Sequence, residues 1–350
     1  MSGPLNVHVD RTPPPDWGVF AAARGTFYHT TAWLEGISRL FRYQTRYVWA
    51  TDGSGVAGIL PLAVVPSLGG GRRLVSYPFS FAVGPVAVDA ASAALLVGQG
   101  IEEARALGCR GIEIKQSDPG APVAPSFQRV VHYRSYRVAT AAGTEAVWGR
   151  LHGDSTRRGI KKAEREGVTV RRGEGVADWT AMAMLQEGTS HQHGTPAPPR
   201  AYFEEFCRSL QDAGLADLWL ASAPKSGEAV AGVVVWKGPR EWIYSFGASR
   251  SEFLPLRPNH LLLWRAFQAA ADAGVDLNLG RAAPEQEGLV QFKLRWAGQP
   301  IDLPYDYWPS PSGLNVRDRG HGALAVAATI WRRLPAPVAR WGSRLYRYLG

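Results

Sequence analysis

The sequence predicts an α/β fold, an α+β sandwich, in which one plan of strands and helices occurs twice. The chain has 350 residues, of which 45% are hydrophobic and 20% charged, a globular composition with length enough for two domains. A hairpin, a strand, a helix and a further strand follow one another over 47–115 and again over 218–279. A doubled α/β unit is the simplest account of this repetition.

Cap and turn residues delimit the elements of the first half. Thr30 or Thr31 is expected to cap the helix that contains Trp33. The run Asp52-Gly53-Ser54-Gly55 predicts a hairpin turn, and Gly108 predicts a helix end. The predicted elements, in order, are a helix from Trp33, extended segments over 47–50, 56–65, 72–78 and 82–88, a helix over 92–107, and strands over 111–115 and 130–138.

Glycines again mark the ends of elements in the second half. Gly214 and Gly274 each follow an apolar helical pattern, and Gly227 lies in a hairpin loop. The predicted helices are 147–166, 178–187, 200–211 and 259–273, and the predicted strands are 168–172, 218–223, 230–236, 241–247 and 275–279. A strand or helix is expected over 289–296. We therefore predict domains over 1–150 and 151–315, followed by a basic tail over 316–350.

The charge balance and the chain start indicate the class of partner and the compartment. A net charge of +9 favours an anionic partner, which could be nucleic acid, a phosphorylated co-substrate or acidic lipid. Cys109 and Cys207 lie in apolar patterns, so buried free thiols are expected. The first residues do not form a secretory signal, and no apolar run is long enough to span a bilayer. We expect a cytoplasmic protein.

The sequence DLNLGRAAPEQEGLVQFKLRWAG, residues 276–298, is the strongest functional candidate. Its first strand is expected to stop at a turn formed by Gly280-Arg281. Arg281 and Lys293 would then lie at the ends of two elements, where a fixed cation can point into a cleft. The alternative is that both are ordinary surface cations.

The motif GR followed by FKLRWAG resembles the C-terminal part of the Fem-like branch of the GNAT acyltransferase superfamily, which includes the peptidoglycan-bridge aminoacyltransferases. The resemblance covers residues 26–308 and includes FYHTTAWL, GILPLAVVPS, GRRLVSYPFSFAVGP and STRRGIKKAEREGV. It implies two tandem GNAT-type domains with mixed, mainly antiparallel sheets. This chain departs from the family in lacking a long helical-hairpin insertion, in Ala282 where many relatives have Ser, and in Trp296-Ala297 where many have Phe-Gly.

A basic run in the second half is a candidate for donor binding. Arg158, Lys161 and Lys162 share one face of a predicted helix with Arg165, a spacing suited to phosphates. We assign Arg157, Arg158, Lys161 and Lys162 to the donor or its phosphates. The alternative is a solvated helix face. Because Arg157-Arg158-Gly159 is a poor version of a glycine-rich phosphate loop, coenzyme A does not follow from the sequence.

The chain has no recognisable nucleophile motif, which favours direct attack of an amine on an activated acyl group. Such a reaction needs a donor for the developing oxyanion and a route for the amine proton. Lys293 and Arg281 are the candidate cations, and Asp276 is a candidate base, with ion pairing as its alternative role.

Several aromatic residues and one histidine are candidates for substrate binding, although most aromatic residues at such spacings belong to the core. His193 lies in a segment expected to be a proline-rich loop, and no zinc site is expected there because acidic and cysteine ligands are absent nearby. The complete set of substrate-binding candidates is Trp33, Tyr77, Phe79, His193, Tyr244, Phe292 and Trp296.

The tail contains six arginines and no acidic residue after Asp318. Interleaved aromatic residues make contact with an anionic membrane surface one interpretation, and packing on the body of the protein the other. Pro335 and Pro337 are expected to divide the tail into two short helices.

The sequence thus predicts a cytoplasmic Fem-like N-acyltransferase without a permanently bound cofactor, with a peripheral position at the inner face of the membrane as the further prediction from its tail. Its donor could be aminoacyl-tRNA, acyl-CoA or a carrier-protein thioester. Its acceptor could be an amino sugar, a cell-wall precursor or a small amine. A non-catalytic accessory protein of envelope or exopolysaccharide assembly is the alternative.

Overall fold

The computed structural model describes residues 5–67, 70–124, 126–224, 227–309, 328–334 and 341–348. The chain divides into two compact units. Unit 1 comprises Met1–Tyr133, Asp302–Arg319 and Arg347–Gly350, and unit 2 comprises Arg134–Ile301 and Gly320–Tyr346. The chain passes between the units inside β7 (Gln128–Val138) and again inside β13 (Gln299–Trp308). The predicted domain bounds at 150 and 315 stay predictions.

Unit 1 consists of a β-sheet with helices packed against it. Its elements are β1 (Asn6–Asp10), α1 (Trp17–Arg24), η1 (Phe27–His29), α2 (Thr31–Phe41), β2 (Gln44–Asp52), β3 (Gly55–Pro66), β4 (Arg72–Val75), β5 (Val86–Ala87), α3 (Ala90–Ala106) and β6 (Ile112–Lys115). The strand order is β1-β2-β3-β4-β6-β13, with β5 paired to β3. Thr30 caps α2 as predicted, because its side chain accepts a hydrogen bond from the Trp33 N–H.

Unit 2 repeats this plan. Its elements up to the second hairpin are η2 (Thr140–Ala142), α4 (Thr144–Arg150), the π-helical turn η3 (Gly153–Arg157), α5 (Arg158–Arg165), β8 (Thr169–Arg172), α6 (Gly175–His193), the π-helical turn η4 (Tyr202–Cys207), α7 (Arg208–Asp212), β9 (Ala216–Ser222) and β10 (Ala229–Lys237). Those that follow are β11 (Glu241–Ser249), η5 (Ser251–Leu256), α8 (Pro258–Asp272), β12 (Asp276–Ala282), α9 (Glu287–Arg295) and the terminal η7 (Gly342–Tyr348).

The two sheets have the same topology. In unit 2 the strand order is β8-β9-β10-β11-β12-β7. Within each unit, every described pair of neighbouring strands is antiparallel except one, which is β4–β6 in unit 1 and β11–β12 in unit 2. A crossover helix, α3 or α8, joins the two strands of each parallel pair. The predicted doubled unit with a mixed, mainly antiparallel sheet is confirmed.

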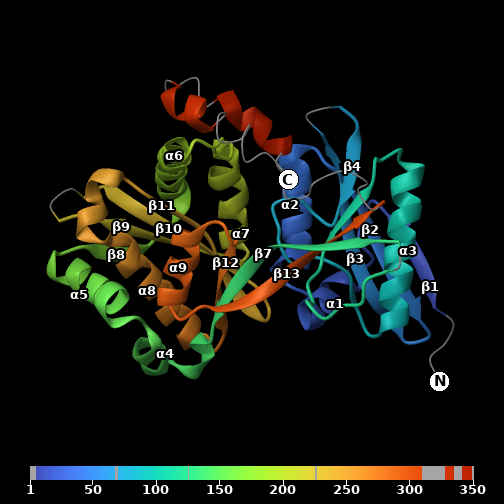
Figure 1. Cartoon of the computed structure of the whole chain (residues 1–350), viewed down its shortest axis with the longest axis horizontal. Helices are drawn as coiled ribbons and strands as arrows, with labels where there is room; N and C mark the ends of the chain where they lie inside the picture. The colour runs from blue at the N-terminus through green and yellow to red at the C-terminus, as the bar shows by residue number, and fades with distance from the viewer. Residues whose placement is uncertain are drawn as a thin grey trace. The chain divides into compact units, whose positions relative to one another are not determined.

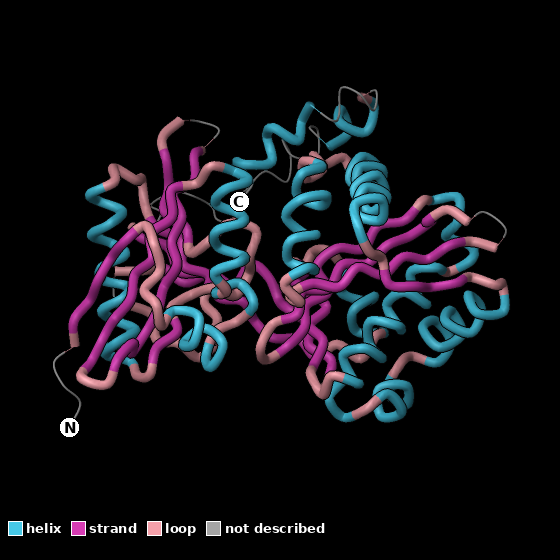
Figure 2. The backbone as a smooth tube through the Cα atoms, turned by 180° about the vertical axis from the view of Figure 1, so that it is seen from behind, coloured by secondary structure: helices cyan, strands magenta, loops and turns pink. Residues whose placement is uncertain are grey.

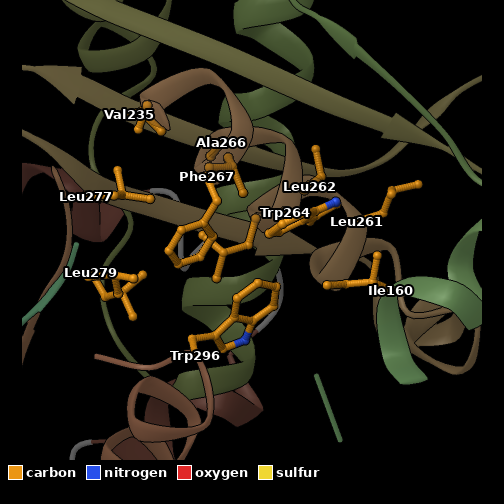
Figure 3. Close-up of a cluster of buried hydrophobic side chains, with 14 of the residues drawn as sticks. Ile160, Val235, Leu261, Leu262, Trp264, Ala266, Phe267, Leu277, Leu279 and Trp296 are labelled. Carbon is orange, nitrogen blue, oxygen red and sulfur yellow. The ribbon is translucent and has the colours of Figure 1, made fainter. Parts of the chain in front are cut away.

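Helices cover both faces of the unit 2 sheet. Figure 1 shows α6 and α7 on one face and α8 and α5 on the other, and Figure 2 shows the same layers from behind. On the α8 face, Phe267 stacks on Trp296 with ring centroids 5.2 Å apart. Figure 3 shows this pair among Leu262, Leu277 and other apolar side chains of the core. The α8 face therefore holds the main core of unit 2.

Three local predictions in unit 2 were wrong. β12 runs through Gly280-Arg281 instead of turning there, because Gly280 adopts a left-handed φ of 74° inside the strand. α6 continues through His193 to a left-handed Gly194, so the expected loop around His193 is helical. The single helix predicted over 147–166 is broken near Leu151 into α4, η3 and α5.

We predict that Phe267→Ala lowers the free energy of unfolding by about 3–5 kcal/mol, because it leaves a cavity beneath Trp296. Phe253→Ala is the matched control, since Phe253 is only partly buried. Urea unfolding followed by circular dichroism measures both variants. Equal destabilisation by the two substitutions would contradict the assignment of this core.

Candidate functional site

The parallel strands β11 and β12 separate after three residue pairs. The pairs run from Glu241–Asp276 to Ile243–Asn278. β11 then continues to Ser249 and β12 to Ala282, with no further pair between them in the part of the chain described here. The separation leaves an opening between two strand ends, the usual position of a ligand site in sheets with parallel neighbours.

Each strand carries a bulge where the separation begins. In β11, Tyr244 and Phe246 face consecutive residues of β10, so Ser245 is an extra residue. In β12, Leu279 and Gly280 together oppose a single residue of β7. Bulges bend strands, re-aim side chains and leave peptide groups outside the ladder, and they are frequent beside active sites.

Gly280 is required at the second bulge. Its φ is 74°, and its N–H donates to the side-chain oxygen of Asn278 at 2.9 Å. A Cβ at this position would lie 3.2 Å from the carbonyl oxygen of Tyr244 and 3.8 Å from Nζ of Lys293. Glycine therefore lets β12, the β11 bulge and Lys293 approach one another closely.

Lys293 lies beneath this bulge. Its side chain is buried, and Nζ donates to the carbonyl oxygens of Leu279 and Gly280, the latter at 3.0 Å. Burial lowers the pKa of Lys293 to about 7, so the side chain is poised between its charged and neutral forms near neutral pH. The lysine both fixes the bulge and places a titratable amine beside it.

Tyr244 adds a hydroxyl on β11. Its ring packs against the α8 core, and burial raises the pKa of its phenol to about 12. Its hydroxyl lies where a Cβ of residue 247 would be, so Gly247 makes room for it. Within the described ranges we find no hydrogen-bond partner for this hydroxyl. A protonated phenol is therefore available as a donor.

Arg281 is exposed on β12, next to Gly280. Tyr346 of the tail lies near it. Burial raises the pKa of the Tyr346 phenol, and the positive charge of Arg281 acts in the opposite direction. Tyr346 was missed in the sequence because the tail had no motif that connected it with Arg281.

The other candidates on this segment lie elsewhere. Asp276 begins β12, at the opposite end from Arg281, and its carboxylate accepts a hydrogen bond from the Ala141 N–H at 3.3 Å. Trp296 is buried in the core, and Phe292 is half-buried with its ring centroid 6.1 Å from that of Trp296. Their roles in catalysis and substrate binding stay predictions.

The four donor-binding candidates lie on consecutive turns before and within α5. Arg158 and Lys161 are exposed, and Arg157 and Lys162 are half-buried. Gly159 faces α8, where a Cβ would lie 2.4 Å from a ring carbon of His260. Burial, with the charge of Arg257, lowers the pKa of His260 to about 4. This histidine, which the sequence analysis missed, therefore packs the basic helix against the start of α8 as a neutral ring.

Trp33, Tyr77 and Phe79 lie in unit 1. Trp33 and Tyr77 are fully buried, and the Tyr77 hydroxyl hydrogen-bonds to Leu34 and Thr45. Tyr77 and Phe79 both have a positive φ, 62° and 59°. His193, in unit 2, is the exposed last residue of α6. The substrate contacts of these four residues stay predictions.

In unit 1 the corresponding opening is filled by the chain itself. Beyond Val75, the N–H of Ser76 donates to the Glu113 carbonyl at 2.8 Å, and the N–H of Val83 donates to the Lys115 carbonyl at 3.0 Å. The Lys115 N–H and Nζ donate to Ser76 Oγ and the Tyr77 carbonyl, at 2.7 and 2.9 Å. The segment after β4 thus fills, in unit 1, the position that corresponds to the opening between β11 and β12 in unit 2.

Comparison with known proteins agrees with this geometry. Residues 153–293 match the family model described as an acetyltransferase (GNAT) domain, a span that begins at η3 and ends at Lys293. The matched residues form a GNAT acyltransferase domain. It lies in unit 2 and includes the whole β11–β12 opening.

Solved structures extend the likeness of fold beyond the GNAT domain. FemX is 15% identical, with a TM-score of 0.68 over 85% of this chain and 96% of its own. L-PGS from Bacillus licheniformis is 14% identical, with a TM-score of 0.60 over 93% and 99%. A tandem GNAT protein from the clavulanic acid pathway is 10% identical, with a TM-score of 0.50 over 87% and 98%. A search of curated proteins found no match. The predicted GNAT resemblance and the acyltransferase class are confirmed, and the predicted likeness to Fem-like proteins is confirmed as a likeness of fold.

Among the helices that the structure describes, none has both the length and the hydropathy required to cross a bilayer.

We predict that Lys293 makes the stability of the GNAT domain depend on pH. Its pKa is about 7 in the folded chain against 10.5 for an ordinary lysine, so between these values the unfolded chain binds more protons. The contribution of Lys293 to stability is therefore full above about pH 10.5, decreases as pH falls towards 7, and is lost below that pH.

Urea unfolding between pH 7 and 10 tests this prediction. Relative to wild type, Lys293→Met should have a smaller rise in stability with pH, whereas Lys161→Met, at an exposed position, should retain the wild-type rise. Parallel curves for all three proteins would show that Lys293 has an ordinary pKa.

Proposed function

We propose that the GNAT domain transfers an acyl or aminoacyl group from an activated donor to an amine at the β11–β12 opening. The observation that carries the proposal is that these strands separate at two bulges, with the Tyr244 hydroxyl and the Lys293 ammonium group beside them. The shared GNAT fold supports the class of reaction.

In the proposed reaction, the neutral amine of the acceptor attacks the acyl carbonyl carbon. A carbon–nitrogen bond forms, and the carbonyl oxygen becomes an oxyanion. Collapse of this intermediate breaks the carbon–sulfur bond of a thioester or the carbon–oxygen bond of an aminoacyl ester. The acceptor nitrogen releases a proton to water, and the leaving thiolate or alkoxide takes one up.

Tyr244 is suited to donate a hydrogen bond to the oxyanion, because its raised pKa keeps the phenol protonated. Lys293 holds the carbonyls of Leu279 and Gly280 and, when protonated, adds positive charge beside them. We propose that Arg281 binds a negative group of either substrate at the exposed side of β12. Asp276 is at the far end of this strand, so its proposed role as a base would have to be indirect.

The basic face before and within α5 is proposed to bind the donor. Aminoacyl-tRNA, acyl-CoA and a carrier-protein thioester all carry phosphate groups near the acyl group or along the donor. Arg158 and Lys161 are exposed. Among the described ion pairs, Arg158 pairs with one carboxylate, that of Asp154. The three donors therefore remain alternatives within one proposal.

The closed opening in unit 1 supports a structural role for that unit. A donor at β4–β6 would have to displace the hydrogen bonds of Ser76, Val83 and Lys115. We propose that catalysis takes place in unit 2, and the substrate-binding roles of Trp33, Tyr77 and Phe79 in unit 1 stay predictions.

We predict that Tyr244→Phe lowers kcat by about 100-fold with little change in KM, the typical cost of one lost oxyanion donor. Its thermal stability should match wild type, because no described residue accepts a hydrogen bond from this hydroxyl. Tyr202→Phe is the matched control, since Tyr202 packs among Phe203 and Phe246. Unchanged turnover in Tyr244→Phe would remove this residue from the mechanism.

A donor panel tests the proposed function itself. Thermal shifts are measured with acyl-CoAs, charged and uncharged tRNA, and acylated carrier protein, followed by transfer of a labelled acyl group to amino sugars and small amines. We expect one donor class to stabilise wild type, to stabilise an Arg158→Glu/Lys161→Glu variant less, and to support turnover that Lys293→Ala loses. Full activity of Lys293→Ala would contradict the assigned site.

A non-catalytic accessory role is the second candidate. Its support is the tail, whose arginines and aromatic residues suit peripheral contact with the inner face of an anionic membrane. Truncation after Asp318 separates the two functions. An enzyme should keep its turnover on soluble substrates, whereas a recruitment module should lose its activity in the cell.

A further inference from the structure

A pocket of about 360 Å³ lies beside the C-terminal half of α6 in unit 2. Met184, Gly188 and His191 line it from one face of the helix. The segment Ala197–Pro199 forms a second wall, and Trp331 of the tail forms a third. The pocket is therefore built from the GNAT domain and from the tail together.

Four of the polar side chains in these walls have partners. Glu187 pairs with Arg200 at 2.7 Å, and Nε2 of His191 lies 2.9 Å from the Leu334 carbonyl oxygen. The Thr195 hydroxyl donates to the Ser190 carbonyl at 3.3 Å. The surface that remains for a ligand is mostly apolar, so the pocket suits an apolar group rather than a sugar or a nucleotide.

Gly188 leaves space at the floor of the pocket. It lies inside α6, and a Cβ at this position would meet nothing within 4 Å. Glycine inside a helix costs stability, and no close backbone approach requires it here. Glycine at this position therefore enlarges the pocket and lowers the stability of the helix.

The tail next to the pocket exposes both cations and apolar side chains. Arg332, Arg333 and Arg344 are exposed in its described parts. Ile330 and Trp341 are 58% and 68% exposed. The chain has no acidic residue after Asp318, so no acidic side chain of the segment 319–350 neutralises these arginines. Such a surface is complementary to anionic headgroups with apolar chains beneath them.

We propose that this pocket takes an acyl chain of an anionic phospholipid from a membrane surface, while the tail arginines bind phospholipid headgroups. The pocket supplies the apolar site, and the tail supplies the charge. The inference extends the peripheral contact proposed for the tail, and it does not depend on acyl transfer. It gives the membrane contact a specific lipid site, which the basic tail alone would not.

Two sets of variants separate the pocket from the charge. Gly188→Leu places an apolar side chain in the pocket at a position where a Cβ meets nothing within 4 Å, and Gly149→Leu in α4 is its matched control, because a Cβ there also meets nothing within 4 Å. The triple variant Arg332→Glu/Arg333→Glu/Arg344→Glu reverses the charge of the tail. Each full-length protein is sedimented with vesicles of phosphatidylglycerol mixed with phosphatidylcholine, and with vesicles of phosphatidylcholine alone. Native mass spectrometry then detects phospholipid that the recovered protein retains.

We expect wild type and Gly149→Leu to bind the phosphatidylglycerol vesicles and to retain one phospholipid. Gly188→Leu should bind about tenfold more weakly and retain none, since the burial of about two methylene groups is lost. The triple variant should lose vesicle binding. Retention of phospholipid by Gly188→Leu at the wild-type level would overturn the pocket assignment. Absent binding, or equal binding to phosphatidylcholine alone, would overturn the membrane contact itself.

Discussion

The candidate site depends on one constraint, a parallel strand pair that stops after Ile243 and Asn278. Parallel pairing holds β11 and β12 together at one end, and a bulge in each strand separates them at the other. The second bulge needs a left-handed Gly280, whose N–H bonds to Asn278 and whose carbonyl accepts from Lys293. A buried lysine thus stabilises the backbone that forms the opening and also places its charge there.

The same topology has two different outcomes in one chain. In unit 1, Lys115 bonds to Tyr77, and the segment that begins at Ser76 fills the space beyond β4. In unit 2, both hydrogen bonds that the structure describes for Lys293 Nζ go to its own side of the opening, on β12. Unit 2 therefore has separated strand ends with a donor hydroxyl, and unit 1 has a hydrogen-bonded loop at the corresponding position.

The repeat could be predicted from the sequence because hydrophobic periodicity and turn residues determine the order of elements. The GNAT class was predicted from the resemblance of short motifs, such as GR followed by FKLRWAG, to a known family. The site could be predicted only in part. Lys293 and Arg281 stood out as cations beside glycine and aromatic residues. Gly280 was predicted to form a turn, but it forms a β-bulge, and glycine is common in both structures because both use a left-handed φ. His260 and Tyr346 gave no signal, since their contacts join segments far apart in the sequence. Asp276 was adjacent in sequence but lies at the wrong strand end for direct contact with Arg281.

Hydrogen–deuterium exchange with the activated donor tests the central claim most directly. Peptides covering Tyr244–Ser249 and Asn278–Arg281 should gain protection when the donor that stabilises the protein is added, because it would fill the β11–β12 opening. Peptides covering Ser76–Lys115 of unit 1 should be unchanged, since that opening is already occupied by the chain. Protection confined to Ser76–Lys115, or donor binding with no change at β11 and β12, would contradict the account.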